Sequence, residues 1–337
     1  MSMLAALHRH RPRLAVSRWS SWLLVIVVLG YLLYTPLVSV PFANTQKSLI
    51  FSYALVGLGL NLLTGLTGQI SLGHGAFFAL GAYLCAVLVG NEGWFYLSAV
   101  PVAGVVGFAL GYLFGRPALR LQGLALALVT LALALVTPSV IKRLDGITQG
   151  REGIILDIAE PPSFVSLDQD QWIYYVNLLI LVAGFVVCER LSRGHIGRSM
   201  IGVRDNENVA MTLGIRPATV KTRVFAFSAA MAAIGGVTYA YAIQFVGPEA
   251  FGLDLAIAFI TVIVVGGLTS NAGAVLGAVF IVYMPSWTQE INQSAAGIGY
   301  GVALVLCMLV LPAGLIGLVR IVGHPLVRRV PFLGPNR

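Results

Sequence analysis

Four polar side chains stand close together in an otherwise apolar part of the sequence, at Thr67, Gln69, Ser71 and His74. Together they offer hydrogen-bond donors and acceptors but no carboxylate, lysine or arginine. A path through a membrane needs groups of this kind, because a solute must be bound without being held so firmly that it cannot leave. These residue types therefore indicate a path for a polar solute more than a catalytic centre.

The sequence around these side chains predicts an interrupted pair of membrane helices. Residues 48–91 contain no Asp, Glu, Lys or Arg, and this run is too long for one crossing, which takes about 20 residues. The glycine-rich segment 65–83 lies between or within the two helices. Irregular backbone at membrane depth persists only where protein buries it or a wet cavity faces it. In transporters such broken helices often line the solute path.

Each of these polar side chains also has a structural interpretation. Ser and Thr hydroxyls often bond to the backbone of their own helix. A lone histidine is often a packing residue, so for His74 we favour a structural role, although ionisable residues within membranes are functional candidates by default. For the segment as a whole we favour lining of the path.

Composition sets the class of protein. Hydrophobic residues make up 58% of the 337 residues and charged residues only 10%, whereas a soluble domain carries about 25% charged residues. The three cysteines, Cys85, Cys188 and Cys307, fall in apolar runs without the spacing of a disulfide framework or a metal site. The chain is therefore expected to be a polytopic membrane protein with no separate soluble domain.

Apolar runs predict an all-α fold with about ten transmembrane or partial helices. They cover residues 22–40, 49–66, 74–90, 94–115, 121–140, 172–188, 224–245, 254–268, 272–287 and 298–314. Ten is an even number, so both termini are expected on one side of the membrane. The two short runs at 254–287 form either two crossings or one re-entrant hairpin, and neither alternative moves the termini. Glycines four residues apart, at 107, 111 and 115 and again at 273 and 277, predict close helix contacts.

The distribution of basic residues predicts the orientation. Seventeen of the 21 lysines and arginines fall on the side of the termini, and four fall on the other side, at Lys47, Lys142, Arg143 and Arg151. The positive-inside rule then places both termini in the cytoplasm. The predicted parts are a basic N-terminus at 1–21, a membrane domain at 22–317 with an external loop at 141–171 and a cytoplasmic loop at 189–223, and a basic tail at 318–337.

A second glycine-rich segment, 266–273, resembles the first. Gly65-Leu66-Thr67 and Gly267-Leu268-Thr269 each follow an apolar run and precede a run rich in Gly and Ala. Such an echo is compatible with two structural repeats, which are common in transporters. We therefore expect Asn271 to belong to the opposite wall of the path.

The cytoplasmic loop contains a short predicted helix at 206–213. Asp205 or Asn206 can cap its start, and Gly214 fits the position just past its end. A helix of this length is marginal alone, so it needs a surface on which to pack. The loop is either a connection lying on the protein's own helices or a docking element for a cytoplasmic partner.

Several motifs of the chain resemble one family. The segment from Arg204 to Ile215 resembles the Glu-Ala-Ala-type loop of bacterial ABC importer permeases, although Val209-Ala210 here follows Asn208 where the family often has two alanines after the glutamate. Four further segments resemble branched-chain amino acid permeases of the LivM type: Ser71–Tyr83, Phe245–Phe251, Val265–Ser270 and Leu311–Gly317. The external loop departs from the usual Thr-Gly-Gly run, with Thr148-Gln149-Gly150-Arg151-Glu152-Gly153 in its place.

This resemblance implies an import permease of the bacterial inner membrane. It would pair with a second, homologous permease and two ATPase subunits and would receive solute from a periplasmic binding protein. The residues expected to couple it to the ATPases are Arg204, Asp205, Glu207, Ala210 and Gly214. Those expected to line the path are Thr67, Gln69, Ser71, His74 and Asn271.

The sequence itself agrees with ATP hydrolysis by other chains. None of its three lysines follows a glycine, so a Gly-x-x-x-x-Gly-Lys phosphate loop is impossible. ATP is therefore expected on the partner chains, with no cofactor, metal site or nucleic-acid partner for this chain, which is not expected to be an enzyme.

There are three alternatives to this function. Permeases of this architecture also import amides or urea. An ion-coupled secondary transporter also uses broken helices, but proton coupling usually needs a buried carboxylate or a histidine relay, and no Asp or Glu lies in the middle of a predicted span. A membrane-embedded enzyme would need clustered nucleophiles or carboxylate pairs, and the sequence has none within its apolar runs.

Overall fold

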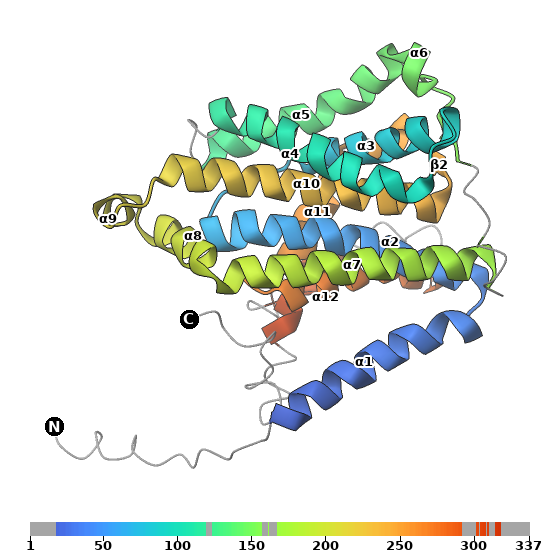
Figure 1. The fold of residues 1–337 in the computed structure, drawn as a ribbon, viewed down its shortest axis with the longest axis horizontal. Helices are drawn as coiled ribbons and strands as arrows, with labels where there is room; N and C mark the ends of the chain where they lie inside the picture. The colour runs from blue at the N-terminus through green and yellow to red at the C-terminus, as the bar shows by residue number, and fades with distance from the viewer. Residues whose placement is uncertain are drawn as a thin grey trace.

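The protein is a bundle of helices that run side by side along its long axis (Figure 1). The computed structural model describes residues 18–118, 123–156, 161 and 167–291, together with 301–302, 304–307, 309 and 314–317. The long helices are α1 (Arg18–Val38), α2 (Pro41–Leu60), α3 (His74–Cys85), α4 (Ala99–Ala118), α5 (Leu124–Arg143), α7 (Gln169–Arg193), α10 (Pro217–Ile243), α11 (Leu253–Gly266) and α12 (Asn271–Ile291). Shorter elements are η2 (Asn61–Leu66), η3 (Ala86–Asn91), η4 (Tyr96–Ser98), α6 (Asp145–Thr148), α8 (His195–Asp205), α9 (Glu207–Thr212) and η5 (Pro248–Phe251).

These helices confirm an all-α polytopic membrane protein. Within the described residues, six are long and apolar enough to cross a membrane: Pro41–Leu66, His74–Asn91, Tyr96–Pro117, Leu124–Arg143, Gln169–Arg193 and Pro217–Ile243. Helices occupy each predicted range up to residue 287, while the range 298–314 falls largely outside the described residues. The number of crossings and the sidedness of the termini stay predictions.

Two helix ends differ from the predicted ranges. Helix α7 continues to Arg193, and α10 begins at Pro217, so both enter the segment predicted as the cytoplasmic loop. Charged residues stopped the apolar runs at these points, but a helix can continue beyond the apolar part of a membrane without a change in its backbone. The loop is therefore mostly helical.

Close backbone contacts join α10 to its neighbours α3 and α4. A Cβ atom added at Gly81 would lie 1.8 Å from the carbonyl oxygen of Ala233, and one added at Gly236 would lie 1.9 Å from that of Phe78. The predicted glycine stripe of α4 faces the same helix, since a Cβ at Gly107 would lie 2.7 Å from the Cβ of Ala233. Helices in lipid lack a hydrophobic drive to associate, so such approaches supply the packing.

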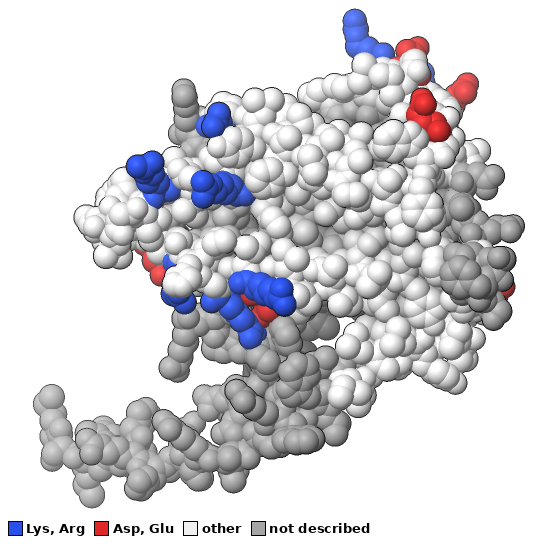
Figure 2. Space-filling model, viewed as in Figure 1, with Lys and Arg blue, Asp and Glu red and all other residues white. Residues whose placement is uncertain are grey.

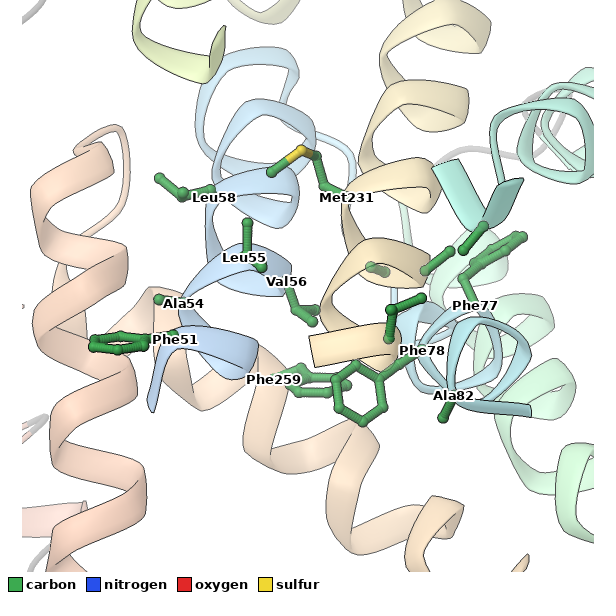
Figure 3. Packing of buried hydrophobic residues seen from close by; sticks show 14 of the residues in the cluster. Phe51, Ala54, Leu55, Val56, Leu58, Phe77, Phe78, Ala82, Met231 and Phe259 are labelled. Atoms are coloured by element: carbon green, nitrogen blue, oxygen red, sulfur yellow. The ribbon is translucent and has the colours of Figure 1, made fainter. Parts of the chain in front are cut away.

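The core lies where α2, α3, α10 and α11 meet. Phe78 of α3 is fully buried, and its ring centroid lies 5.0 Å from that of Phe259 in an edge-on arrangement. Figure 3 shows these rings between α3 and α11, with Leu55 and Val56 of α2 and Met231 of α10 nearby. This core packs together the helices that flank the polar segments.

A small antiparallel pair of strands closes one end of the bundle. Strand β1 (Ile154–Ile155) pairs with β2 (Phe245–Val246), and Ile154 lies opposite Val246. The pair ties the predicted external loop to the end of α10, on the side of the molecule where α6 lies (Figure 1).

At the opposite end, α8 and α9 project beyond the bundle (Figure 1). Lys and Arg side chains gather over this end, and a second, mixed group of acidic and basic side chains lies near α6 (Figure 2).

Candidate functional site

The first predicted break separates α2 from α3. Helix α2 passes into the π-helix η2, which ends before Thr67, and α3 begins at His74; we call residues 67–73 the first break. Gly68 has φ +72°, a conformation that favours glycine. The Thr67 hydroxyl donates to the carbonyl of Leu63 at 2.5 Å, and the Thr64 hydroxyl donates to that of Gln69 at 2.9 Å. These bonds satisfy backbone groups that an intact helix would pair, as membrane-depth breaks require.

His74, the first residue of α3, contacts two neighbouring serines. Its Nδ1 lies 3.2 Å from the Ser71 hydroxyl, and its Nε2 lies 2.6 Å from the hydroxyl of Ser228 in α10. The side chain is 1% exposed and lies edge-on to the rings of Phe77 and Phe225. With both ring nitrogens bonded, His74 joins α3 to α10.

The other side chains of the first break are also buried. Gln69 donates to the Thr67 hydroxyl at 3.2 Å, while its Oε1 is buried with no hydrogen-bond partner in the described part of the chain. Thr67, Gln69 and Ser71 are at most 6% exposed. A solute would therefore reach these groups only after helices move apart.

A second break separates α11 from α12, at residues 267–270. Gly267 has φ +111°, and Thr269 has φ +67°, which is uncommon for a β-branched residue. The Ser270 hydroxyl accepts a hydrogen bond from the backbone N–H of Gly273 at the start of α12. The two similar glycine-rich segments of the sequence thus correspond to two interruptions of helices.

The π-helix η2, which leads into the first break, touches the second break. A Cβ atom added at Gly65 would lie 2.8 Å from the backbone nitrogen of Thr269. Asn61 of η2 donates from Nδ2 to Oδ1 of Asn271 at 2.8 Å, and both side chains are buried. Asn271, which the sequence predicted for the opposite wall of the path, thus contacts η2, the element that leads into the first break. Its place in a solute path stays a prediction.

Glu189 was missed by the sequence reasoning. It was assigned to the start of the cytoplasmic loop, but it lies in α7, is 7% exposed and accepts a hydrogen bond from Asn271 Nδ2 at 2.7 Å. Arg193, one helical turn later, pairs with the same carboxylate. The residues Asn61, Asn271 and Glu189 form a buried polar chain across η2, α12 and α7, which we call the amide–carboxylate chain. The i,i+4 spacing of Glu189 and Arg193 at the end of an apolar run was the available signal.

Arg204 reaches from α8 to the first break. Its Nη1 donates to the backbone carbonyl of Gly65 at 2.8 Å, and its Cγ would lie 3.0 Å from a Cβ atom at Gly68. It also pairs with the neighbouring Asp205 at 3.1 Å. One predicted coupling residue therefore contacts the segment predicted to line the path.

Helix α9 is capped and anchored by the residues singled out in the sequence. Asn206 is the N-cap and accepts from the backbone N–H groups of Asn208 and Val209 at 3.0 and 3.1 Å. Glu207 pairs with Lys221 of α10, and Gly214 has φ +80° just past the helix.

Ala210 faces inward from α9, whereas three apolar side chains of the segment face outward. Ala210 is 2% exposed, and the exposed fractions of Val209, Met211 and Leu213 are 54%, 53% and 75%. A hollow of about 440 Å³ lies between α8 and α9. Sequence reasoning did not single out these outward side chains, although their exposure on a capped helix suits contact with a partner.

Comparison with known proteins now identifies the family. The family described as "Branched-chain amino acid transport system / permease component" matches residues 47–311. The chain belongs to this family. It is 32% identical over 292 residues to the high-affinity branched-chain amino acid transport system permease protein LivM of Salmonella typhimurium, covering 80% of this chain and 68% of that protein. No solved structure matches the chain.

Other relatives agree with this assignment. LivM of Escherichia coli is 31% identical over 297 residues, covering 81% of this chain and 69% of the relative. BraD of Pseudomonas aeruginosa, also a branched-chain amino acid permease, is 24% identical over 283 residues. The match covers 79% of this chain and 92% of BraD. The chain is thus a LivM-type membrane permease of the ABC transporter class, and its relatives are transport subunits rather than enzymes.

Proposed function

We propose that this chain is the permease subunit of a bacterial ABC importer and forms half of a translocation path for branched-chain or related amino acids. The observation that carries the proposal is the hydrogen bond from Arg204 to the carbonyl of Gly65. It joins the cytoplasmic coupling segment directly to a broken membrane helix. The names of the relatives support the solute class, and the predicted orientation supports the cytoplasmic position of α8 and α9.

The remaining parts of the importer are supplied by other chains. A second, homologous permease completes the path, two ATPase subunits bind and hydrolyse ATP, and a periplasmic binding protein delivers the solute. The complex lies in the inner membrane. Helix α9 docks against an ATPase subunit through Val209, Met211 and Leu213, the exposed apolar side chains of this segment.

Force passes from the ATPase to the path through two anchored contacts. Closure of the ATPases moves α9, which the Glu207–Lys221 pair fastens to α10. Arg204 transmits the same movement to the first break. A short helix can transmit movement only when it is held in place, and the Asn206 cap and these contacts attach the N-terminal end of α9.

The path runs along the two breaks. In the state described here Thr67, Gln69, Ser71, His74 and Asn271 are buried. Separation of the breaks exposes their hydroxyl, amide and imidazole groups to a zwitterionic solute. None of the five carries a fixed charge that would trap the solute.

The test uses the importer reconstituted in proteoliposomes with its partner chains. Arg204→Met removes the hydrogen bond to Gly65, and a bond from a charged donor contributes about 1.5–3 kcal/mol, so uptake should fall at least about tenfold. ATP hydrolysis should continue, because no ATP site is touched. Arg198→Met is the matched control, since Arg198 lies on the same helix but bonds His195 three residues earlier.

Two results would contradict the proposal. Normal uptake by Arg204→Met would show that the contact does not couple the coupling segment to the path. Uptake that needs an ion gradient and no ATPase subunit would favour a secondary transporter instead. Purification of the tagged chain from native membranes, with identification of the ATPase and the second permease, checks the partners independently.

A further inference from the structure

A second hollow lies beside the coupling segment and takes no part in the proposed path. It has a volume of about 480 Å³ and lies between α4, α8 and α10, so we call it the α4–α8–α10 groove. Its lining is mostly apolar and includes Phe108, Tyr112, Ile196, Met200, Val224 and Phe227. An apolar hollow of this size at the end of membrane helices suits a hydrocarbon chain better than a polar solute.

One arginine lines this groove, and a second contacts a side chain of its lining. Arg223 is exposed and contributes to the lining. Arg116 donates to the Tyr112 hydroxyl at 2.9 Å, and its guanidinium carbon lies 4.5 Å from the centroid of the same ring. Among the described residues, neither arginine pairs with a carboxylate. Their charges are therefore available to an anion outside the protein.

In the part of the chain that the structure describes, the acidic side chains near the groove have other partners. Each described acidic residue between 189 and 223 is already paired, Glu189 with Arg193, Asp205 with Arg204, and Glu207 with Lys221. Lys and Arg side chains gather over this end of the molecule (Figure 2). The charge at the groove is complementary to an anionic group at its mouth.

We propose that the α4–α8–α10 groove binds an anionic phospholipid, with one acyl chain along the apolar lining and the phosphate at Arg116 and Arg223. Arginine is suited to this contact because its planar fork of donors matches phosphate oxygens. Basic pockets between membrane helices on the cytoplasmic side attract anionic headgroups. The groove unites a chain-sized apolar surface with these two arginines.

A bound lipid would have a mechanical consequence. The groove borders α8, the helix that carries Arg204, and also borders α4 and α10 of the membrane bundle. An acyl chain in it fills the space between these helices. The lipid would therefore hold α8 in the position from which Arg204 contacts the first break.

The experiment measures lipid retained by the purified full-length chain. The chain is delipidated in mild detergent, incubated with equal amounts of dioleoyl phosphatidylglycerol and dioleoyl phosphatidylcholine, and analysed by native mass spectrometry. The wild-type chain should retain phosphatidylglycerol preferentially. Arg116→Gln with Arg223→Gln should lower phosphatidylglycerol retention by about fivefold or more, since each basic residue near a headgroup strengthens binding by about that factor. Retention of phosphatidylcholine should not change.

Matched variants separate a site from general attraction. Arg216 is exposed at the start of α10 but does not line the groove, so Arg216→Gln should leave the lipid preference unchanged. Val220→Trp narrows the groove and should lower retention of both lipids. An equal loss in Arg216→Gln, or full retention in Val220→Trp, would overturn the proposal.

Two further outcomes identify a different occupant. Displacement of phosphatidylglycerol by millimolar inorganic phosphate would show that the arginines bind a free anion without the chain. Release of the lipid when the ATPase subunit binds would show that the groove belongs to a protein interface. Either result overturns the proposal. Because no transport is measured, a negative result here is distinct from a failure of the proposed import function.

Discussion

The first and second breaks interrupt helices in different ways. The first spans seven residues, follows a π-helix and is satisfied largely by threonine hydroxyls. The second spans four residues, and its flanking helices approach so closely that a Cβ at Gly266 would lie 2.0 Å from the carbonyl oxygen of Gly273. The first break is thus held by side chains, whereas the second is held by backbone packing.

The two breaks also differ in what they contact. Just ahead of the first break, the carbonyl of Gly65 accepts a hydrogen bond from Arg204 of α8. The second continues into Asn271, which is fixed by Asn61 and Glu189 inside the bundle. This difference suits a first break that moves with α8 and a second break that stays fixed inside the bundle. Changes to the second break should therefore damage folding most, and changes to the first should damage transport most.

The largest effect is expected where α11 and α12 pack. A Cβ atom at Gly277 would lie 1.9 Å from the carbonyl oxygen of Val262, and neither backbone can move without separating the helices. Gly277→Ala should destabilise the protein by about 3 kcal/mol or more, as overpacked cores do at their worst. Size-exclusion chromatography after heating would measure this loss. Gly30→Ala is the control, because nothing lies within 4 Å of a Cβ there, and an equal loss would contradict the packing argument.

The next effect concerns the carboxylate that fixes the second break. Glu189→Leu leaves Arg193 without this carboxylate and removes the acceptor of Asn271 Nδ2. Removal of one partner from a buried pair costs about 3–5 kcal/mol, and partial exposure of Arg193 places the expected loss near the lower limit. The melting temperature of the purified chain would measure it.

Glu189→Gln separates the two functions of this side chain. It keeps an acceptor for Asn271 but removes the charge that Arg193 pairs with. The loss of stability should be smaller than for Glu189→Leu. If both variants had the same melting temperature as the wild-type protein, the amide–carboxylate chain would not stabilise the second break.

A third effect should fall on transport more than on stability. Gly65 lies between the breaks, and a Cβ there would meet Asn61 Oδ1 at 2.6 Å and Thr269 N at 2.8 Å. Gly65→Ala should push the breaks apart and lower uptake by about tenfold, the effect of roughly 1.4 kcal/mol on the coupling equilibrium. Gly75→Ala is the control, with its nearest neighbour at 4.0 Å. A loss of uptake in Gly75→Ala but not in Gly65→Ala would contradict the role given to Gly65.

The sequence predicted the breaks better than the contacts between them. Glycine-rich segments without charge and the repeated Gly-Leu-Thr indicated both interruptions, because local composition determines where a membrane helix stops. The cap at Asn206 and the end at Gly214 were predictable for the same reason. The bonds from Arg204 to Gly65 and from Asn271 to Glu189 join residues 139 and 82 positions apart. No local pattern encodes such pairs, so Glu189 was assigned to a loop by its charge alone.

The smallest expected effect tests whether the second break is strained. Thr269 has φ +67°, and a left-handed conformation costs a residue with a Cβ about 1–2 kcal/mol. Thr269→Gly removes this cost but adds about 0.4–1 kcal/mol of unfolded-state entropy, so stability should rise slightly or stay level. The change in melting temperature would show whether the relief of backbone strain or the added unfolded-state entropy is larger. A clear loss of stability would mean that the Thr269 side chain itself holds the second break, and the contrast between side-chain and backbone packing would then weaken.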